Sequence, residues 1–356
     1  TASSLHVGSL LQIMILKLMQ KHGHRPIVLL GGGTTLIGDP SGKDTTRKIL
    51  EENQIKENIK SIKKVFNKVL ETKNKKTSPI YVDNAEWLNK LNYIQFLRNI
   101  GANFTINKML TFDSVKIRLD REQSLSYMEF NYMILQAYDF YQLYKNNNCI
   151  LQIGGSDQWG NIVSGVDLIR RKLSKEAFGL TSPLITLASG TKMGKTEKGA
   201  IWLNQDLLSP YDYWQFWRNT DDRDVIKFLK MFTDLNIDEI NKMKDGDINQ
   251  LKIKLANEAT SMLHGKDEAL SAEKTAKKTF EDNSLGENLP SVDIQLNNKN
   301  SSISIIDLII LSKIESSKSE VRRLIKGKGI KINNEIIIDE KFLIQKNSFN
   351  KDNSLK

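Results

Sequence analysis

The chain carries two short segments in which imidazole or basic side chains stand beside glycine. Leu5-His6-Val7-Gly8-Ser9 comes directly before a helical pattern, and Thr191-Lys192-Met193-Gly194-Lys195-Thr196 is a glycine-flanked loop with lysines three residues apart. The first turn of a helix presents free N–H groups to anions, glycine permits close approach, and lysine supplies positive charge. Either segment alone could be an ordinary surface feature, but each could also bind phosphate.

A third group of polar side chains shares one face of a predicted helix. Tyr132, Gln136 and Asp139 follow one another at helical spacing, so they project in one direction and could converge on a small ligand. The alternative is that Tyr132 belongs to the core and the other two side chains face solvent. The spacing by itself leaves both interpretations open.

Apolar runs and helical periodicity predict the elements that would position these residues. A helix over 9–21 precedes a buried strand over 26–30, which runs into Gly31-Gly32-Gly33. A strand over 149–153 runs into Gly154-Gly155 and a helix from about 157 to 172, and a short strand covers 80–82. This alternation predicts an α/β fold with a Rossmann-like, doubly wound parallel sheet and ligands at the carboxyl ends of its strands.

Changes in pattern along the chain predict further parts. The α/β part covers 1–210 with a helical insertion at about 90–140, and amphipathic helices then indicate a helical domain over 211–285. Residues 286–302, rich in Asn, Ser and Lys, are typical of a linker. An apolar helix from residue 303, a helix over 318–326, a glycine turn and strands over 330–332 and 335–338 predict a small α+β domain over 303–350.

Composition excludes several classes of protein. The 356 residues are 39% hydrophobic and 26% charged with a mean hydropathy of -0.40, and no apolar run is long enough for a membrane span. Cys149 is the single cysteine beside four histidines, which excludes an internal disulfide and a structural zinc site. We therefore expect an intracellular protein without a protein-built metal site. The net charge of +10 makes an acidic partner such as nucleic acid plausible.

The basic residues near the C-terminus gather across a predicted helix end, turn and strand, with no acid among them. They offer a positive surface to RNA phosphates, although a solvated basic face without RNA is the alternative. The residues are Arg322, Arg323, Lys326, Lys328 and Lys331.

Four longer motifs allow a comparison with known families. Ile37-Gly-Asp-Pro-Ser-Gly-Lys43, Leu135-Gln-Ala-Tyr-Asp139, Gln152-Ile-Gly-Gly-Ser-Asp-Gln-Trp-Gly-Asn161 and Lys192-Met-Gly-Lys-Thr196 resemble bacterial-type tyrosyl-tRNA synthetases, a family of class I aminoacyl-tRNA synthetases. The resemblance runs over essentially the whole chain. One departure is Ser9, where the family commonly has a second histidine. The chain also begins inside a motif, and the resemblance implies a further strand upstream of Thr1 that contacts tyrosine and adenylate.

The resemblance implies a role for each candidate residue. It assigns the tyrosine substrate to Thr34, Asp39, Tyr132, Gln136, Asp139 and Gln158. It assigns ATP to Thr1, His6, Gly8, Ser9, Gly155, Asp157, Lys192 and Lys195. Catalysis by stabilising phosphate charge falls to His6, Lys43, Arg47, Lys192, Lys195 and Thr196.

The implied activity is the ATP-dependent formation of tyrosyl-adenylate, with Mg²⁺ accompanying ATP, and transfer of the tyrosyl group to tRNA(Tyr). The resemblance also implies a homodimer, with residues 94–119 as the candidate interface, and a location in the bacterial cytoplasm or an organelle matrix. Two alternatives remain open. One is a tryptophanyl-tRNA synthetase, and the other is a synthetase-like RNA-binding protein that has lost the chemistry.

Overall fold

A computed structural model describes residues 3–38, 50–196, 199–280, 302–333 and 335–345, together with residues 292, 294, 348, 349 and 355; the side chains of residues 195, 196, 279 and 280 are not described. The chain divides into two compact units, Thr1–Asn288 and Leu289–Lys356. Each unit is described by itself.

Four strands of the first unit form two parallel pairs. β1 (Ile27–Leu30) pairs with β2 (Ile80–Asp83), and β3 (Leu151–Gly155) pairs with β4 (Phe178–Ser182). The crossover from β1 to β2 contains α2 (Glu52–Val69), and that from β3 to β4 contains α8 (Trp159–Leu173). The parallel arrangement predicted from sequence is confirmed within each pair, whereas α2 and β4 were not predicted. The described strands do not join into one sheet, so the doubly wound sheet stays a prediction.

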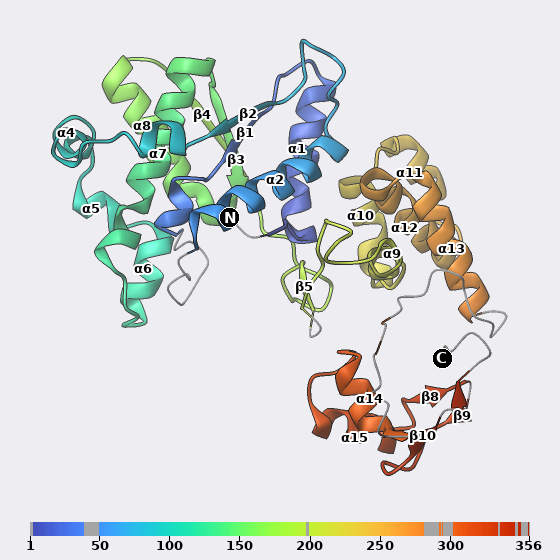
Figure 1. Cartoon of the computed structure of the whole chain (residues 1–356). Coiled ribbons are helices and arrows are strands. Elements are labelled where there is room, and N and C mark those ends of the chain that lie inside the picture. The colour runs from blue at the N-terminus through green and yellow to red at the C-terminus, as the bar shows by residue number, and fades with distance from the viewer. Residues whose placement is uncertain are drawn as a thin grey trace. The chain divides into compact units, whose positions relative to one another are not determined.

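Helices cover the strand pairs because each presents an apolar stripe to them. α1 (Leu10–Lys21) and α2 contribute Leu16 and Ile62 to a cluster with Val28 and Leu30 of β1. On α8, Ile162 lies over β3 and β4, close enough that a Cβ on Gly179 would stand 2.6 Å from it. Figure 1 shows the strands between α1 and α2 on one side and α7 and α8 on the other.

The segment predicted as a helical insertion consists of short helices and the start of a long one. It contains α3 (Ala85–Leu88), α4 (Tyr93–Asn99), α5 (Ile106–Met109), α6 (Asp113–Asp120) and the start of α7 (Tyr127–Asn147). A capping box fixes the start of α7, with Ser126 as N-cap and Glu129 at its third position. The Glu129 carboxylate also pairs with Arg118 of α6 at 3.0 Å, and both side chains are buried. The helix that carries the predicted tyrosine-binding face is therefore anchored at its first turn.

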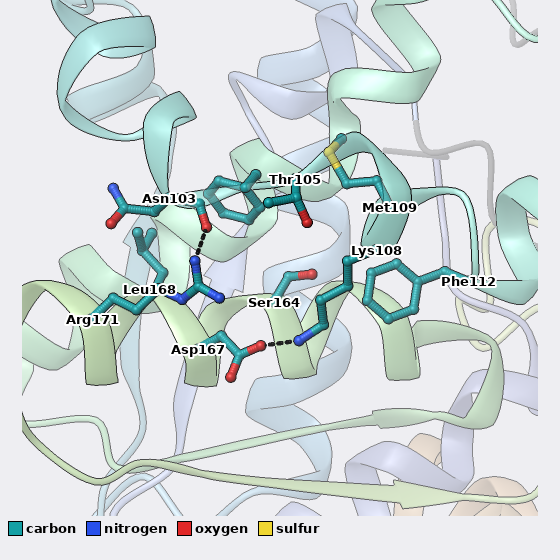
Figure 2. Close-up of a pocket in the computed structure, with 10 residues that line it drawn as sticks. Asn103, Thr105, Lys108, Met109, Phe112, Ser164, Asp167, Leu168 and Arg171 are labelled. Carbon is teal, nitrogen blue, oxygen red and sulfur yellow. Dashed lines mark hydrogen bonds and ion pairs between the residues drawn. The ribbon is translucent and has the colours of Figure 1, made fainter.

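The insertion is held against α8 by polar contacts. Figure 2 shows the Arg171 guanidinium donating to the Asn103 carbonyl, at 2.8 Å, and the ion pair between Lys108 and Asp167. The ring of Phe112 packs so closely on Gly160 that a Cβ there would lie 2.8 Å from it. The insertion is thereby fixed on the helix that follows β3.

A helical segment completes the first unit with α9 (Pro210–Arg218), α10 (Asp222–Phe232), α11 (Ile237–Met243), α12 (Ile248–His264) and α13 (Lys266–Phe280). Aromatic side chains fill its core, among them Trp214, Trp217, Phe228 and Phe232. Asp234, just after α10, forms ion pairs with Lys17 and Lys21 of α1. These helices belong to the same compact unit as the strands, so a domain boundary at residue 210 stays a prediction.

The second unit contains β7 (Ser302–Ser304), α14 (Ile305–Leu311), α15 (Lys318–Lys326), β8 (Lys331–Ile332), β9 (Glu335–Ile336) and β10 (Leu343–Gln345). Its core includes Ile305, Val321, Ile325 and Ile344. The helix predicted from residue 303 begins at Ile305, because residues 302–304 pair with β10 instead. Among all described helices, none has the length and apolar character needed to cross a bilayer.

Candidate functional site

A cavity of about 1440 Å³ opens between the two strand pairs, with residues of β1, β3, α1 and α7 in its walls. Most of the predicted ligand-binding residues that the structure describes meet there. They are His6, Gly8, Ser9, Thr34, Tyr132, Gln136, Asp139, Gly155 and Asp157. Segments far apart in sequence therefore meet around one cavity, which is lined by residues from both ends of β1 and β3.

The two glycine-flanked segments touch each other beside this cavity. A Cβ on Gly8 would lie 2.6 Å from the Met193 carbonyl oxygen, and one on Gly194, whose φ is +110°, would lie 2.6 Å from His6 Nδ1. The Val7 N–H donates to the Ile201 carbonyl at 2.8 Å. This approach needs glycine on both sides, and it sets the loop that carries Lys192 against the His6 segment.

The ring of His6 is oriented by its own turn. Its Nδ1 accepts a hydrogen bond from the Gly8 N–H at 3.1 Å, just before α1 begins. A neutral imidazole that accepts at Nδ1 carries its proton on Nε2. The ring therefore has an N–H donor of the kind that a phosphate oxygen accepts.

Asp139 is the most deeply enclosed charged group in the cavity wall. Its side chain is 2% exposed, Oδ2 accepts from Asn84 Nδ2 at 2.8 Å, and Oδ1 accepts from the Trp87 indole N–H at 2.7 Å. Burial raises the pKa of Asp139 to about 7, against the opposing effect of the two donors. A carboxylate has more acceptor sites than these two bonds use, so it can accept from a ligand as well.

Other polar residues form a network around this face of α7. Asn84 Nδ2 also donates to Thr34 Oγ1 at 3.0 Å, and Asn161 Nδ2 donates to the side-chain oxygens of Gln136 at 3.0 Å and Gln158 at 3.2 Å. Gln158 is thus tied to Gln136 through Asn161, although it is not among the residues that line the cavity.

The sequence interpretation missed Asn84, Trp87 and Asn161. Asn84 directly follows β2, and Trp87 lies three residues further on, at the carboxyl end of a strand that had been predicted. That position favours ligand contacts and was the available signal. Asn161 closes the glycine-rich motif that begins at Gln152.

Some predicted residues cannot be placed in the site. Thr1, Asp39, Lys43 and Arg47 lie outside the described residues. Lys195 and Thr196 are described only as the backbone of β5 (Lys195–Thr196), which pairs with β6 (Gly199–Ala200). Lys192 is exposed and is not among the residues that line the cavity; its neighbours Met193 and Gly194 lie against Gly8 and His6. Within the described ranges, no three His, Cys, Asp or Glu side chains are grouped to hold a metal ion.

Two of the five basic residues predicted to bind RNA form ion pairs with acidic side chains. Arg322 pairs with Glu340 at 3.3 Å, and Arg323 pairs with Glu320 at 2.6 Å. Glu320 lies three residues before Arg323 on α15, and the fold brings Glu340 to Arg322, so both arginines already have an acidic partner. Lys326, Lys328 and Lys331 are exposed.

Comparison with known proteins decides the family. A family model described as tRNA synthetases class I (W and Y) matches residues 1–281. The chain belongs to this family. This class I synthetase is 68% identical to a tyrosine–tRNA ligase of Pelagibacter ubique over 98% of its own length and 85% of the relative's, and 57% identical to a tyrosine–tRNA ligase of Zymomonas mobilis over 97% and 84%.

Solved structures agree with that assignment. The class I synthetase resembles a C-terminally truncated mitochondrial tyrosyl-tRNA synthetase of Aspergillus nidulans, with a TM-score of 0.69 and 33% identity over 79% of this chain and 83% of the other. The mixed α/β, helix-rich architecture is therefore that of a class I synthetase.

Proposed function

We propose that this chain is a tyrosine–tRNA ligase, which activates L-tyrosine with ATP and transfers the tyrosyl group to tRNA(Tyr). The observation that carries the proposal is that one cavity joins the His6 segment, with the Lys192 loop beside it, to the buried carboxylate of Asp139. Phosphate-binding and hydroxyl-binding groups thus lie around the same space. The relatives reported above, whose names say tyrosine–tRNA ligase, support the same conclusion.

The reaction requires the protein to align the substrates and to stabilise charge, and it needs no general base. The tyrosine carboxylate attacks the α-phosphorus of ATP, tyrosyl-adenylate forms and pyrophosphate leaves; a ribose hydroxyl at the 3′ end of the tRNA then takes the tyrosyl group and releases AMP. A carboxylate is already an anionic nucleophile, so catalysis consists of alignment and stabilisation of charge that moves onto the leaving pyrophosphate. We assign that task to His6 and Lys192, and by resemblance to Lys43, Arg47, Lys195 and Thr196.

ATP would lie along the His6 end of the cavity and tyrosine along α7. Asp157 and Gly155 line the same cavity after β3, where the Asp157 carboxylate could accept from the ATP ribose. A Cβ on Gly155 would stand 2.6 Å from Asp157 Oδ1, so glycine lets that carboxylate fold back toward the strand end. Mg²⁺ would arrive with the ATP phosphates as part of the substrate.

The size of the cavity supports the expectation of a further contacting strand. Small-molecule pockets usually enclose about 300–1000 Å³, and this cavity of about 1440 Å³ separates β1 from β3. Among the described strands, β1 and β3 each have one unpaired edge. A parallel strand between them would pair with both edges and complete the doubly wound sheet.

Tyrosine-dependent exchange of pyrophosphate into ATP tests the proposal. Exchange with tyrosine and not with tryptophan would support a tyrosine enzyme. Exchange with tryptophan would favour the tryptophanyl alternative, and RNA binding without exchange would favour the synthetase-like RNA-binding protein. The function fits the bacterial cytoplasm or an organelle matrix, where charged tRNA is used, and cell fractionation would test that location.

The second unit is proposed to bind tRNA through its exposed lysines. Replacing Lys326, Lys328 and Lys331 together with glutamine should weaken tRNA binding and lower the slope of log affinity against log salt by about one per lost phosphate contact. Tyrosine activation should be unchanged, because the described residues that line the cavity all belong to the first unit. Filter binding over a salt series measures the slope, and replacing Lys313 and Lys341 with glutamine gives a control. An unchanged slope would contradict the RNA role.

The insertion is proposed as the homodimer interface because it exposes large apolar side chains. Ile94 and Ile106 are 69% and 63% exposed, and Ile117 and Leu119 are also exposed. Replacing Ile94 and Ile106 with aspartate should convert a dimer into a monomer, since a charge in an apolar interface loses its hydration. Light scattering measures the molar mass of both forms. An unaltered protein that is monomeric at assay concentrations would contradict the proposal.

A further inference from the structure

The loop that carries Lys192 is the second arm of a small hairpin. The Leu187 N–H donates to the Thr191 carbonyl at 2.8 Å, and the Met193 N–H donates to the Ile185 carbonyl at 2.9 Å. Thr186 and Lys192 face each other as an isolated bridge. The position of the first arm, residues 185–188, therefore determines where Lys192 can lie.

Two side chains of α10 hold that first arm. Asp224 Oδ2 accepts from the Ala188 N–H at 2.6 Å, and Lys227 Nζ donates to the Thr186 carbonyl at 3.1 Å. Asp224 Oδ1 and Lys227 Nζ pair with each other at 2.5 Å. Each of the two side chains thus bonds both the hairpin and the other side chain.

Asp224 and Lys227 together form a clamp on the hairpin, and the burial of Asp224 strengthens it. Asp224 is 3% exposed, so its ionised carboxylate is stabilised mainly by the Ala188 N–H and by Lys227. Hydrogen bonds to an ion are shorter and stronger than neutral ones. Both residues stand on a helix whose next turn enters the aromatic core through Phe228, and Lys227 lies 4.8 Å from the centre of that ring.

We propose that Asp224 and Lys227 are positioning residues for ATP activation, because they hold the 185–193 hairpin so that Lys192 is aimed at the phosphates. This proposal rests on the proposed function, since it assigns the phosphate contact to Lys192. The hairpin leads through Met193 and Gly194 to the His6 segment. α10, which lies beyond the predicted α/β part, would thereby support the activation site.

Asp224→Asn is the main test. The amide keeps the size of the side chain but cannot pair as an ion with Lys227 while accepting from Ala188. Loss of a charge-assisted bond predicts a fall of about tenfold or more in kcat/KM for ATP in pyrophosphate exchange. KM for tyrosine should be unchanged, because the Asp224 carboxylate bonds Ala188 and Lys227 and is not among the residues that line the cavity. Hydrogen exchange at the Ala188 amide should become faster.

The matched control is Asp222→Asn. Asp222 is on the same first turn, 67% exposed, and pairs with Lys252 instead of the hairpin. This variant removes the same charge from the same helix and should leave both readouts unchanged.

Lys227 supplies a second pair of variants should Asp224→Asn fail to fold. Lys227→Met should reproduce the loss in kcat/KM for ATP, and Lys227→Arg should restore most of it by keeping a charged donor. Normal ATP kinetics and hydrogen exchange in both Asp224→Asn and Lys227→Met would overturn the clamp. An unaltered protein without tyrosine-dependent exchange would instead overturn the proposed function, and the hydrogen-exchange comparison would still test the clamp.

Discussion

Asp139→Ala should abolish most of the preference for tyrosine over phenylalanine. The carboxylate is enclosed, is held by Asn84 and Trp87, and faces the cavity. Phenylalanine would leave this buried acceptor without its third donor, and a site of that kind discriminates strongly. Tyrosyl-tRNA synthetases are the reference example of such discrimination, with a preference of about 10⁵ for tyrosine over phenylalanine. We expect kcat/KM for tyrosine to fall, and that for phenylalanine to fall less or to rise, in pyrophosphate exchange.

Two further measurements separate this effect from a general disturbance. Burial raises the pKa of Asp139 to about 7, so the ionised fraction increases as the pH rises from 6 to 8. The preference of the unaltered protein for tyrosine should therefore increase over that interval. Asp139→Asn keeps the volume of the side chain and should remove this pH dependence. A ratio of tyrosine to phenylalanine kinetics that stays unchanged in Asp139→Ala would mean that another residue recognises the hydroxyl.

Lys192→Ala should slow the formation of tyrosyl-adenylate by about 10²-fold, or about 3 kcal/mol, while tyrosine binding stays nearly normal. Negative charge moves toward the departing pyrophosphate during the reaction, so a cation there is worth more in the transition state than in the bound substrates. The hairpin sets Lys192 beside the His6 segment, whereas tyrosine would lie along α7. Lys195→Ala is expected to behave in the same way.

Single-turnover activation with saturating tyrosine and ATP measures this effect. Lys175→Ala is a suitable control, because Lys175 is an exposed lysine shortly before β4 and is not among the residues that line the cavity. Rates that remain normal in Lys192→Ala and Lys195→Ala would remove the loop from the chemistry. An equal loss of activation rate in Lys175→Ala would show that the loss in Lys192→Ala comes from the change in net charge.

Local patterns in the sequence were sufficient for much of the fold. The apolar run before Gly31 became β1, and the three polar residues of α7 do share one wall of the cavity. Such features depend on neighbours a few residues away, so spacing alone predicts them. The helix α2 was overlooked although its buried residues Ile55, Ile62, Val65 and Val69 recur at helical spacing, because lysines dominate its composition.

The sequence by itself determined most of the elements, the motifs and the family, because these are properties of short segments. Only the tertiary structure decided which segments meet. Nothing local indicates that Gly8 must lie against Met193, that Asn84 holds Asp139, or that Glu340 pairs with Arg322. The same is true of the clamp from Asp224 to Ala188. These contacts join positions that are far apart in the sequence. They form when helices and strands pack their apolar faces together. The polar pairs therefore follow from this packing and not from any spacing along the chain.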